Sequence, residues 1–350
     1  MNRNKTIKCV VWDLDNTLWQ GILSEDQIVY PIEKAVKIVK TLDERGILQS
    51  IASRNEYHEA MKVLEDYKLK EYFIYPQIGW LPKSESIKII AKSINIGLDT
   101  IAFIDDQPFE REEVGFSLPE VLCLGNDIYD NLLSMPEMNP RFITSESKER
   151  RKYYINDIKR NKSEETFIGA KEDFLASLKM NFSLFEVSED DLKRAEELTI
   201  RTNQLNSTGF VYSYEELNKL RKSKDHMLLT ASLEDKYGSY GTIGLSLIEC
   251  KNSRWIIKLL LMSCRVISRG VGTIMLYSII NEALKRNVEL FADFIETPNN
   301  RMMYLTFKLA GFRDIEANDK KTRLKYNLSI NQKIPDYVNV ISVWDTYSQR

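Results

Sequence analysis

Carboxylates directly follow two strand-like segments of this 350-residue sequence. The apolar run Ile7–Trp12 is followed by Asp13 and Asp15, and a later apolar run is followed by Asp105 and Asp106. Ligands of open parallel sheets bind at the carboxyl ends of the strands. Clustered carboxylates repel one another unless a cation lies between them, and hard oxygen ligands suit Mg²⁺. The spacing therefore predicts a magnesium site, with these four aspartates as candidate metal ligands.

Two further residues complete the set that phosphoryl transfer requires. Ser53 follows the strand-like segment Ile47–Ala52 and offers a hydroxyl to a phosphate oxygen, while Lys83 opens a helix-like segment and offers a positive charge. Phosphoryl transfer through a covalent intermediate needs a carboxylate nucleophile, a metal ion and fixed positive charge around the phosphate. Ser53 and Lys83 are therefore the candidate phosphate-binding residues.

The four motifs, in this order along the chain, resemble those of the haloacid dehalogenase (HAD) superfamily. The resemblance implies that Asp13 is the nucleophile that forms an aspartyl-phosphate, that Asp15 is the general acid and base, and that Ser53 and Lys83 hold the phosphoryl group. It also implies that Asp105 is the main side-chain ligand of Mg²⁺ after Asp13, with Asp106 beside it. Asp15 would reach the metal through its backbone carbonyl.

Short intervals between the motifs bear on the substrate. Only 39 residues lie between Asp13 and Ser53, and a helix and a strand already occupy them. The interval from Ser53 to Lys83 is filled in the same way. No cap domain fits at either place, so the site is open to a macromolecule-borne substrate or is covered by another domain.

Strand-like and helix-like segments alternate along the first part of the chain. Such alternation predicts an α/β fold with a doubly wound parallel sheet that carries helices on both faces. The predicted helices are Pro31 to about Gly46, Glu56–Tyr67 and Ser84–Ile94, and the predicted strands are Ile7–Trp12, Ile47–Ala52, Tyr72–Tyr75, Thr100–Ile104 and Val121–Leu124.

The pattern changes after Pro140. Residues 145–165 are dense in charges of both signs and predict a solvated helical connector. We therefore predict a HAD-like phosphatase domain at 1–140, a charged helical connector at 141–180, and a second domain at 181–350. In the second domain the predicted helices are Ser188–Thr202, a helix ending at Lys285 and Asn299–Ala310, and the predicted strands are Met227–Leu233, Ile243–Ile248, Trp255–Met262 and Leu290–Phe294.

One cysteine of the second domain stands where a thiol could react. Cys264 ends a buried strand, and a glycine-bearing loop follows and leads into a helix. Nearby arginines and a helix N-terminus lower a thiol pKa and bind anionic groups. Cys264 is thus the candidate acyl-accepting nucleophile, with inert packing as the alternative. The candidate pantetheine- or pyrophosphate-binding residues around it are Arg265, Arg269, Gly270 and Gly272.

This strand, loop and helix resemble the acyltransferase fold of the GNAT family. Two departures from that family's pattern weaken an assignment to acetyl-CoA chemistry. Ile267 stands where the pyrophosphate motif usually has Gln or Arg, and Phe307 stands where many members place a tyrosine acid. The resemblance thus predicts a GNAT-like mixed α/β domain that binds a pantetheine arm.

Longer stretches in both halves resemble one family, the FkbH-like glyceryl transferase/phosphatases of polyketide biosynthesis. The family implies D-1,3-bisphosphoglycerate as substrate and a glyceryl thioester on the phosphopantetheine arm of an acyl carrier protein as product. The matching stretches are 8–19, 50–53, 75–80, 103–111, 201–206, 263–266 and 269–272.

Four polar residues of the second half are further candidates for substrate or pantetheine binding. Arg201, Asn203 and Gln204 follow one another at a polar helix end, and capping and surface hydrogen bonding are the alternative roles for them. Asn300 opens another helix.

Composition excludes several classes of protein. The 49 basic and 51 acidic residues give a net charge of −2, and they form no basic stripe, so a nucleic-acid partner is not expected. Two histidines argue against histidine-built zinc sites and Ser-His-Asp catalysis. Four cysteines without paired spacing argue against disulfides. With no signal peptide or membrane span expected, we predict a cytoplasmic protein.

Two alternatives compete with the glyceryl transferase/phosphatase prediction. The first is a capless phosphatase fused to an acetyl-CoA-dependent N-acetyltransferase. The second is a non-catalytic module that docks a carrier protein, although the intact set of Asp13, Asp15, Ser53, Lys83 and Asp105 argues against a decayed site.

Overall fold

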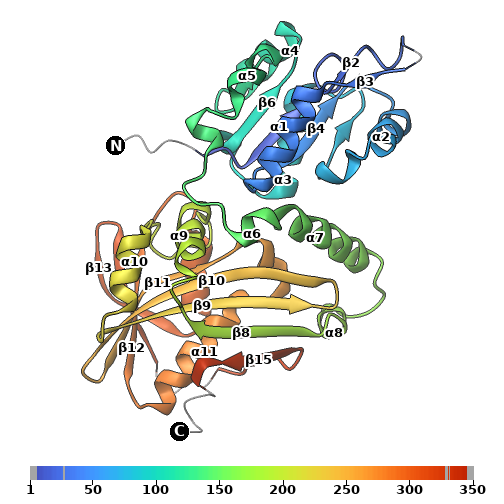
Figure 1. Ribbon diagram of the computed structural model, residues 1–350. Coiled ribbons are helices and arrows are strands. Elements are labelled where there is room, and N and C mark those ends of the chain that lie inside the picture. Colours follow the sequence, from blue (N-terminus) through green and yellow to red (C-terminus); the bar gives the residue numbers. More distant parts are fainter. Residues whose placement is uncertain (1–5, 27, 328–329, 331, 345–350) are drawn as a thin grey trace. The chain divides into compact units, whose positions relative to one another are not determined.

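Two compact units, Met1–Ile155 and Asn156–Arg350, make up the computed structural model of the chain (Figure 1). The structure describes residues 6–26, 28–327, 330 and 332–344. The division falls within a helix, α7 (Arg150–Glu165). Each unit has its own hydrophobic core.

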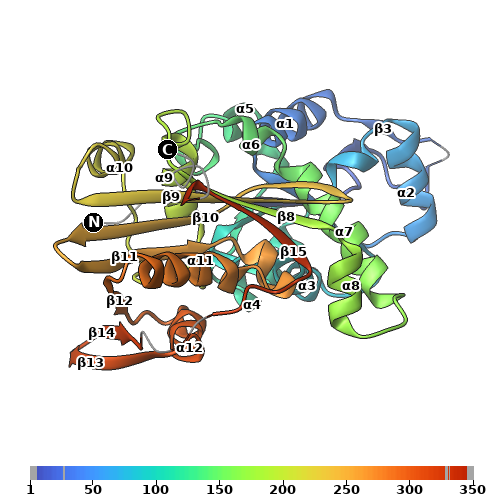
Figure 2. The same ribbon diagram turned by 90° about the horizontal axis from the view of Figure 1, so that it is seen from below.

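A parallel sheet organises the first unit. Among the described residues it has five strands, in the order β5-β4-β1-β6-β7 (Figure 1). The central strand β1 is buried at all four positions, as expected for a strand covered on both faces. Helices α1 and α5 lie on one face, and α3 and α4 lie on the other (Figures 1 and 2). The strands are β1 (Cys9–Trp12), β4 (Leu48–Ser53), β5 (Gln77–Ile78), β6 (Ile101–Ile104) and β7 (Leu122–Leu124), with a separate β2–β3 pair (Trp19–Gln20 and Tyr30–Pro31), and the helices are α1 (Glu33–Glu44), α2 (Tyr57–Asp66), α3 (Lys83–Ile94), α4 (Pro108–Ser117), α5 (Tyr129–Leu132) and α6 (Ser145–Lys148).

Helix α1 ends where the glycine signal predicts. Gly46 has a φ of 73°, in the left-handed region that glycine adopts without strain, and its N–H bonds back to Asp43. The start differs from the prediction, because Pro31 pairs with Trp19 in the β2–β3 ribbon. The helix therefore begins two residues later, at Glu33.

The predicted strand at Tyr72–Tyr75 is wrong. Tyr72 ends a short 3₁₀ turn, and Tyr75 has a φ of 50°, which breaks an extended backbone. Pro76 then offers no N–H to the ladder. On the side of β4 away from β1, regular strand pairing within the described residues is made by β5, at Gln77–Ile78.

Helix α4 has no counterpart among the predicted segments. Its ten residues bury only two side chains, Glu110 and Val114, so the apolar spacing that identifies a core-facing helix is missing. The proline at its first position, Pro108, is the start signal that could have located it.

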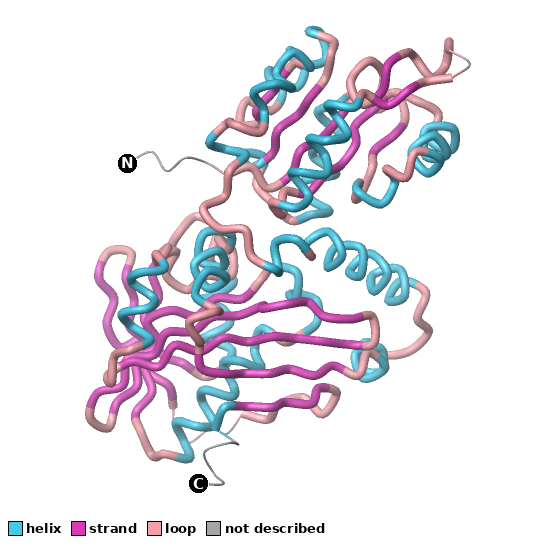
Figure 3. The backbone as a smooth tube through the Cα atoms, viewed as in Figure 1, coloured by secondary structure: helices cyan, strands magenta, loops and turns pink. Residues whose placement is uncertain are grey.

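A mixed sheet organises the second unit (Figure 3). Within the described residues it has eight strands, in the order β13-β14-β12-β11-β10-β9-β8-β15, with β11–β12 and β15–β8 parallel and the other neighbours antiparallel. The predicted fold class, a doubly wound α/β sheet followed by a mixed α/β domain, is confirmed. The strands are β8 (Met180–Glu186), β9 (His226–Asp235), β10 (Gly238–Lys251), β11 (Arg254–Met262), β12 (Glu289–Ile295), β13 (Phe312–Asn318), β14 (Lys321–Tyr326) and β15 (Val338–Ser342), and the helices are α8 (Lys171–Ser177), α9 (Leu192–Arg201), α10 (Tyr214–Arg221), α11 (Gly272–Lys285) and α12 (Arg301–Leu309).

Helix α7 is not the solvated helix that its charge density predicts. Within the first unit, Arg150 donates to the carbonyl of Gly46 at 2.5 Å, and Arg151 pairs with Asp43 at 3.0 Å. Charge composition cannot distinguish such inward pairing from solvation, because the partners lie about a hundred residues away in sequence.

Arg160 is the most deeply buried charge of α7. Its side chain is fully buried, donates two bonds of 2.8 Å to the carboxylate of Asp235, and pairs with Asp157 at the same distance. The guanidinium also stacks 3.7 Å from the ring centroid of Tyr240. A buried pair of this kind fixes α7 on the sheet of the second unit.

We predict that Arg160→Ala lowers the free energy of unfolding by about 3–5 kcal/mol, because Asp235 would remain buried without its cation. The measurement is urea unfolding followed by circular dichroism. Lys152→Ala is the matched control on the same helix. Lys152 pairs with Glu149 in solvent, so its loss should cost about 1 kcal/mol or less. Equal unfolding midpoints for the two variants would contradict the prediction.

Candidate functional site

Three neighbouring strands bring the predicted phosphoryl-transfer residues to one edge of the parallel sheet. Asp13 directly follows β1, Asp105 directly follows β6, and Ser53 is the last residue of β4. The strand order β4-β1-β6 makes these ends adjacent, and the Asp13 N–H bonds to the carbonyl of Ile104 at 2.9 Å. The sheet order alone therefore assembles residues that lie far apart in sequence.

Lys83 supplies the buried positive charge of this site. It is the first residue of α3, where Pro82 at the cap position starts the helix. Its side chain is only 3% exposed, and its ammonium donates to Asp13 Oδ1 and to Asp105 Oδ2, the latter at 3.0 Å. One cation thus bridges two buried carboxylates.

A group of three carboxylates is the candidate metal centre. One oxygen each from Asp13, Asp105 and Asp106 lies within 4.8 Å of the others. Burial raises the pKa of Asp13 to about 6 against the opposing effect of Lys83, and it also raises the pKa of Asp105 and Asp106. Carboxylates that are costly to ionise together gain from a divalent cation. The three residues therefore fit Mg²⁺.

The Asp15 side chain is turned away from that group. Trp19 Nε1 and the Leu23 N–H donate to its Oδ1 at 2.8 and 3.1 Å, and Asn55 Nδ2 donates to its Oδ2 at 3.0 Å. These three donors fix the orientation of the Asp15 carboxylate. Asp15 is predicted to reach the metal through its backbone carbonyl and to act as acid and base through its side chain, and both roles stay predictions.

Asn55 and Thr17 belong to the site and were missed as functional residues. Asn55 links Asp15 to Ser53, because its amide also donates to Ser53 Oγ at 3.1 Å. The Thr17 hydroxyl accepts from the Asp106 N–H at 3.0 Å and lies 3.3 Å from Asp106 Oδ1. The sequence signal that could have identified them is their position. Asn55 stands two residues after Ser53, and Thr17 stands two residues after Asp15.

Cys264 lies at the end of β11, as predicted, and is half-buried against the core of the second unit. It opens a 3₁₀ segment, Cys264–Arg269, and helix α11 begins only at Gly272. In the described part of the chain no disulfide joins any of the cysteines.

His226, one of the two histidines of the chain, lies too far along the sheet to act as a base for the Cys264 thiol. His226 pairs with Glu249 across β9 and β10, and Glu249 pairs with Ile256 of β11. Ile256 lies six positions before the strand end at Met262, which is about 20 Å along an extended strand. His226 is therefore not the base for Cys264.

The two arginines near Cys264 face acidic groups of α7. Arg269 is 1% exposed, and its head group donates to Glu164 at 2.6 Å and to Asn161 at 2.7 Å. The positive charge of Arg265 lowers the pKa of Asp157 against the larger effect of burial, so these two groups also lie close together. The prediction that Arg269 binds pantetheine or pyrophosphate is wrong in this structure, because its side chain is buried in the ion pair.

The two loop glycines differ in their surroundings. Gly270 has a φ of 68°, and a Cβ there would lie 2.6 Å from the hydroxyl of Tyr337. Around Gly272, at the start of α11, no described atom lies within 4 Å of the position of an added Cβ. The binding of an anion by this loop stays a prediction.

The segment after α9 fills a gap in the second sheet. β11 and β12 pair only over the Arg254–Ile257 part of β11. Beyond it, the backbone of Leu205–Ser207 bonds to Leu260 and Met262 on one side. On the other side the Ile295 N–H bonds to Ser207 at 3.0 Å. The chain's own backbone thus pairs with both strands where they separate.

The remaining polar candidates lie on either side of this filled gap. Arg201 is the last residue of α9 and is half-buried, and Asn203 and Gln204 are exposed in the turn that follows. Asn300 is fully buried, and its amide donates to the carbonyls of Asn206 and Ile295 at 3.0 and 2.8 Å. Its Oδ1 accepts from the Thr297 N–H at 2.8 Å. Asn300 is therefore a structural residue, and its prediction as a ligand-binding residue is wrong.

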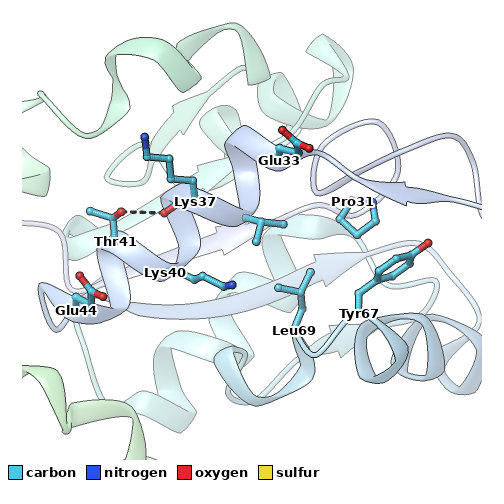
Figure 4. Close-up of a pocket in the computed structure, with 9 residues that line it drawn as sticks. Pro31, Glu33, Lys37, Lys40, Thr41, Glu44, Tyr67 and Leu69 are labelled. Carbon is cyan, nitrogen blue, oxygen red and sulfur yellow. Dashed lines mark hydrogen bonds between the residues drawn. The ribbon is translucent and has the colours of Figure 1, made fainter.

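A surface hollow of about 480 Å³ lies beside α1 in the first unit (Figure 4). Side chains of α1 line it together with Pro31, Tyr67 and Leu69. It contains none of the predicted site residues.

Within the residues that the structure describes, no helix is both long and apolar enough to span a membrane.

Comparisons with known proteins found solved structures that are similar to part of the chain. No family model and no curated protein matches. The N-terminal part of protein BF1531 from Bacteroides fragilis, described as containing a phosphatase domain complexed with Mg, is 30% identical over 39% of this chain, with a TM-score of 0.34. This chain covers 40% of that structure's length.

Several acetyltransferase structures are also similar to part of the chain. The ribosomal-protein-S18-alanine N-acetyltransferase from Escherichia coli is 13% identical over 43% of this chain and 97% of its own, with a TM-score of 0.34. The PaiA N-acetyltransferase from Thermoplasma acidophilum, in complex with coenzyme A, is 12% identical over 42% of this chain and 98% of its own, with a TM-score of 0.31.

We predict that Mg²⁺ stabilises the protein more at about pH 7.5 than at pH 5. Burial raises the pKa of Asp13 from its usual 3.8 to about 6, so the folded protein binds more protons than the unfolded chain between these values. The contribution of Asp13 to stability therefore falls as the pH rises through this window. Mg²⁺ needs the ionised carboxylate, and saturation a hundredfold above its Kd should add about 2.7 kcal/mol at the higher pH.

Thermal unfolding with MgCl₂, against NaCl of equal ionic strength, measures this difference. Asp105→Asn should lose the Mg²⁺-dependent shift in Tm. Asp130→Asn, which alters a solvent-exposed pair with Lys34, should keep it. A shift of the same size at both pH values would contradict the assignment.

Proposed function

We propose that the chain is a bifunctional glyceryl transferase/phosphatase. It takes the phosphoglyceryl group of D-1,3-bisphosphoglycerate onto Cys264, removes the phosphate, and passes the glyceryl group to the phosphopantetheine thiol of an acyl carrier protein. The observation that carries the phosphatase half is the buried cluster in which Lys83 bridges Asp13 and Asp105 beside Asp106. The Mg-bound phosphatase domain of BF1531 supports the same assignment.

In the phosphatase half, Asp13 attacks the phosphorus and the bond to the substrate oxygen breaks. Asp15, held by Trp19 and Asn55, protonates the leaving oxygen and then takes a proton from the water that hydrolyses the aspartyl-phosphate. Lys83 offsets negative charge beside the nucleophile. Mg²⁺, bound by Asp13, Asp105 and Asp106, would neutralise charge on the phosphoryl oxygens.

Access to this site depends on the short connections around it. In the described part of the chain, the connection from β1 to β4 holds only the β2–β3 ribbon and α1, and the connection from β4 to α3 holds α2, a 3₁₀ turn and β5. Neither connection contains a cap domain. An open site of this kind suits a phosphate that arrives on a larger carrier.

In the transferase half, the thiolate of Cys264 attacks the carbonyl carbon of the acyl phosphate. The carbon–oxygen bond to the phosphate breaks, and inorganic phosphate leaves with the electron pair. An acyl phosphate is already activated, so this step needs no nucleotide. The pantetheine thiol then displaces the cysteine from the thioester, which restores the Cys264 thiol.

We expect wild-type protein mixed with D-1,3-bisphosphoglycerate and Mg²⁺ to gain a glyceryl adduct by intact-protein mass spectrometry. Asp13→Asn should stop at the phosphoglyceryl adduct, because it lacks the nucleophile that removes the phosphate. Cys264→Ala should gain neither adduct. Cys250→Ala is the matched control, since Cys250 is also half-buried in the second unit and burial raises the pKa of its thiol to about 11.

An adduct that survives in Cys264→Ala would move the acylated residue elsewhere. The absence of any adduct on wild-type protein would refute the thioester step, whereas release of phosphate from other phosphate esters would still test the Asp13 site separately.

A further inference from the structure

The mouth of the phosphoryl-transfer site carries exposed side chains that the reaction at Asp13 does not use. Asp13 and Lys83 are 5% and 3% exposed. Trp80 and Phe109, which lie close to them in the fold, are 74% and 69% exposed. Exposed aromatic side chains that gather in one place mark a candidate binding surface.

Two contacts connect the segments that carry these aromatic residues to Ser53 and Arg54. The Gly79 N–H donates to the carbonyl of Ser53 at 2.9 Å, and Trp80 is the next residue. Arg54 follows Ser53 and pairs with Glu110 at 3.3 Å. Phe109 precedes Glu110 at the start of α4. Arg54 is therefore linked through Ser53 to the segment that carries Trp80 and through Glu110 to the helix start that carries Phe109.

Arg54 has donors to spare for a ligand. Its side chain is 42% exposed, and within the described residues the ion pair with Glu110 is the contact of its head group. A guanidinium carries five N–H donors in a fixed plane. One charged contact leaves most of them directed at the solvent in front of the site.

Glu110 is built to hold Arg54. Its side chain is 7% exposed, and its Oε2 is buried with no hydrogen-bond partner among the described residues. A buried carboxylate with an unused oxygen is unfavourable by itself, and its cation is the group that compensates it. Glu110 therefore draws the guanidinium against the start of α4 and fixes its direction.

We propose that Arg54, Trp80 and Phe109 determine substrate specificity by binding the part of the substrate beyond its phosphate, with Glu110 as the positioning residue of Arg54. The substrate class is a phosphorylated acyl group held in a thioester, for which a pantetheine thioester is a soluble probe. This inference rests on the proposed phosphatase function. Arg54 donates to the hydroxyl and carbonyl oxygens of the acyl group, and the two aromatic faces pack against the thioester and the chain that carries it.

The test compares two substrates on full-length protein with Mg²⁺: 3-phosphoglyceryl-S-pantetheine and p-nitrophenyl phosphate. The ratio of their kcat/KM values should fall about tenfold or more in Arg54→Ala and in Trp80→Ala, mainly through a higher KM for the thioester. Arg54→Lys should recover part of the ratio. Glu110→Gln should raise the same KM by a smaller factor, because the guanidinium stays but is no longer held.

Phe116→Ala is the matched control, because Phe116 is 92% exposed near the other end of the same helix. It should leave the ratio unchanged. An unchanged ratio in Arg54→Ala and Trp80→Ala overturns the proposal, as does wild-type protein that hydrolyses p-nitrophenyl phosphate but not the pantetheine substrate. Wild-type protein that hydrolyses neither substrate would instead refute the phosphatase function itself.

Discussion

The ammonium of Lys83 between Asp13 and Asp105 is the interaction on which the first unit depends. Each of these three side chains is almost fully buried, and an isolated buried charge is strongly unfavourable. One cation does not balance the three acidic groups Asp13, Asp105 and Asp106. Burial raises the pKa of each carboxyl, and the neighbouring carboxylates add to that effect. The same excess of negative charge makes the cluster a candidate binding site for a divalent cation.

The strand order of the parallel sheet and the start of α3 bring these side chains together. Strands β4, β1 and β6 must be neighbours for Ser53, Asp13 and Asp105 to meet, and α3 must begin at Lys83 for the ammonium to reach them. Uncharged side chains hold two of the acidic residues in place. Asn55 donates a hydrogen bond to the Asp15 carboxylate, and the Thr17 hydroxyl accepts one from the Asp106 N–H.

The sequence could predict this site because its residues occupy strand ends, which hydrophobic runs locate well. Strands at Cys9–Trp12 and Ile101–Ile104 follow from continuous apolar runs, and the acids after them follow directly. Prediction failed where a side chain's partner is distant in sequence. The pairs Arg269–Glu164 and Arg160–Asp235 span more than seventy residues, and nothing local distinguishes them from surface charges. The prediction that Asn300 binds a ligand failed for the same reason, because the partners of its side chain include the distant backbone of Asn206.

The acidic partners of Arg265 and Arg269 bear on the reactivity of the Cys264 thiol. Sequence proximity suggests that Arg265 and Arg269 lower the pKa of Cys264, yet Arg269 is committed to Glu164 and Arg265 lies against Asp157. An arginine whose charge is offset by an adjacent acid contributes little field at a neighbouring sulfur. In the proposed transfer, the driving force therefore comes from the substrate, because a phosphate leaving group makes the acyl carbon reactive toward even a small fraction of thiolate. The acyl phosphate is consumed when the acyl group moves to the thiol. In the proposed sequence, the phosphatase then removes the second phosphate, which the thioester-borne group still carries.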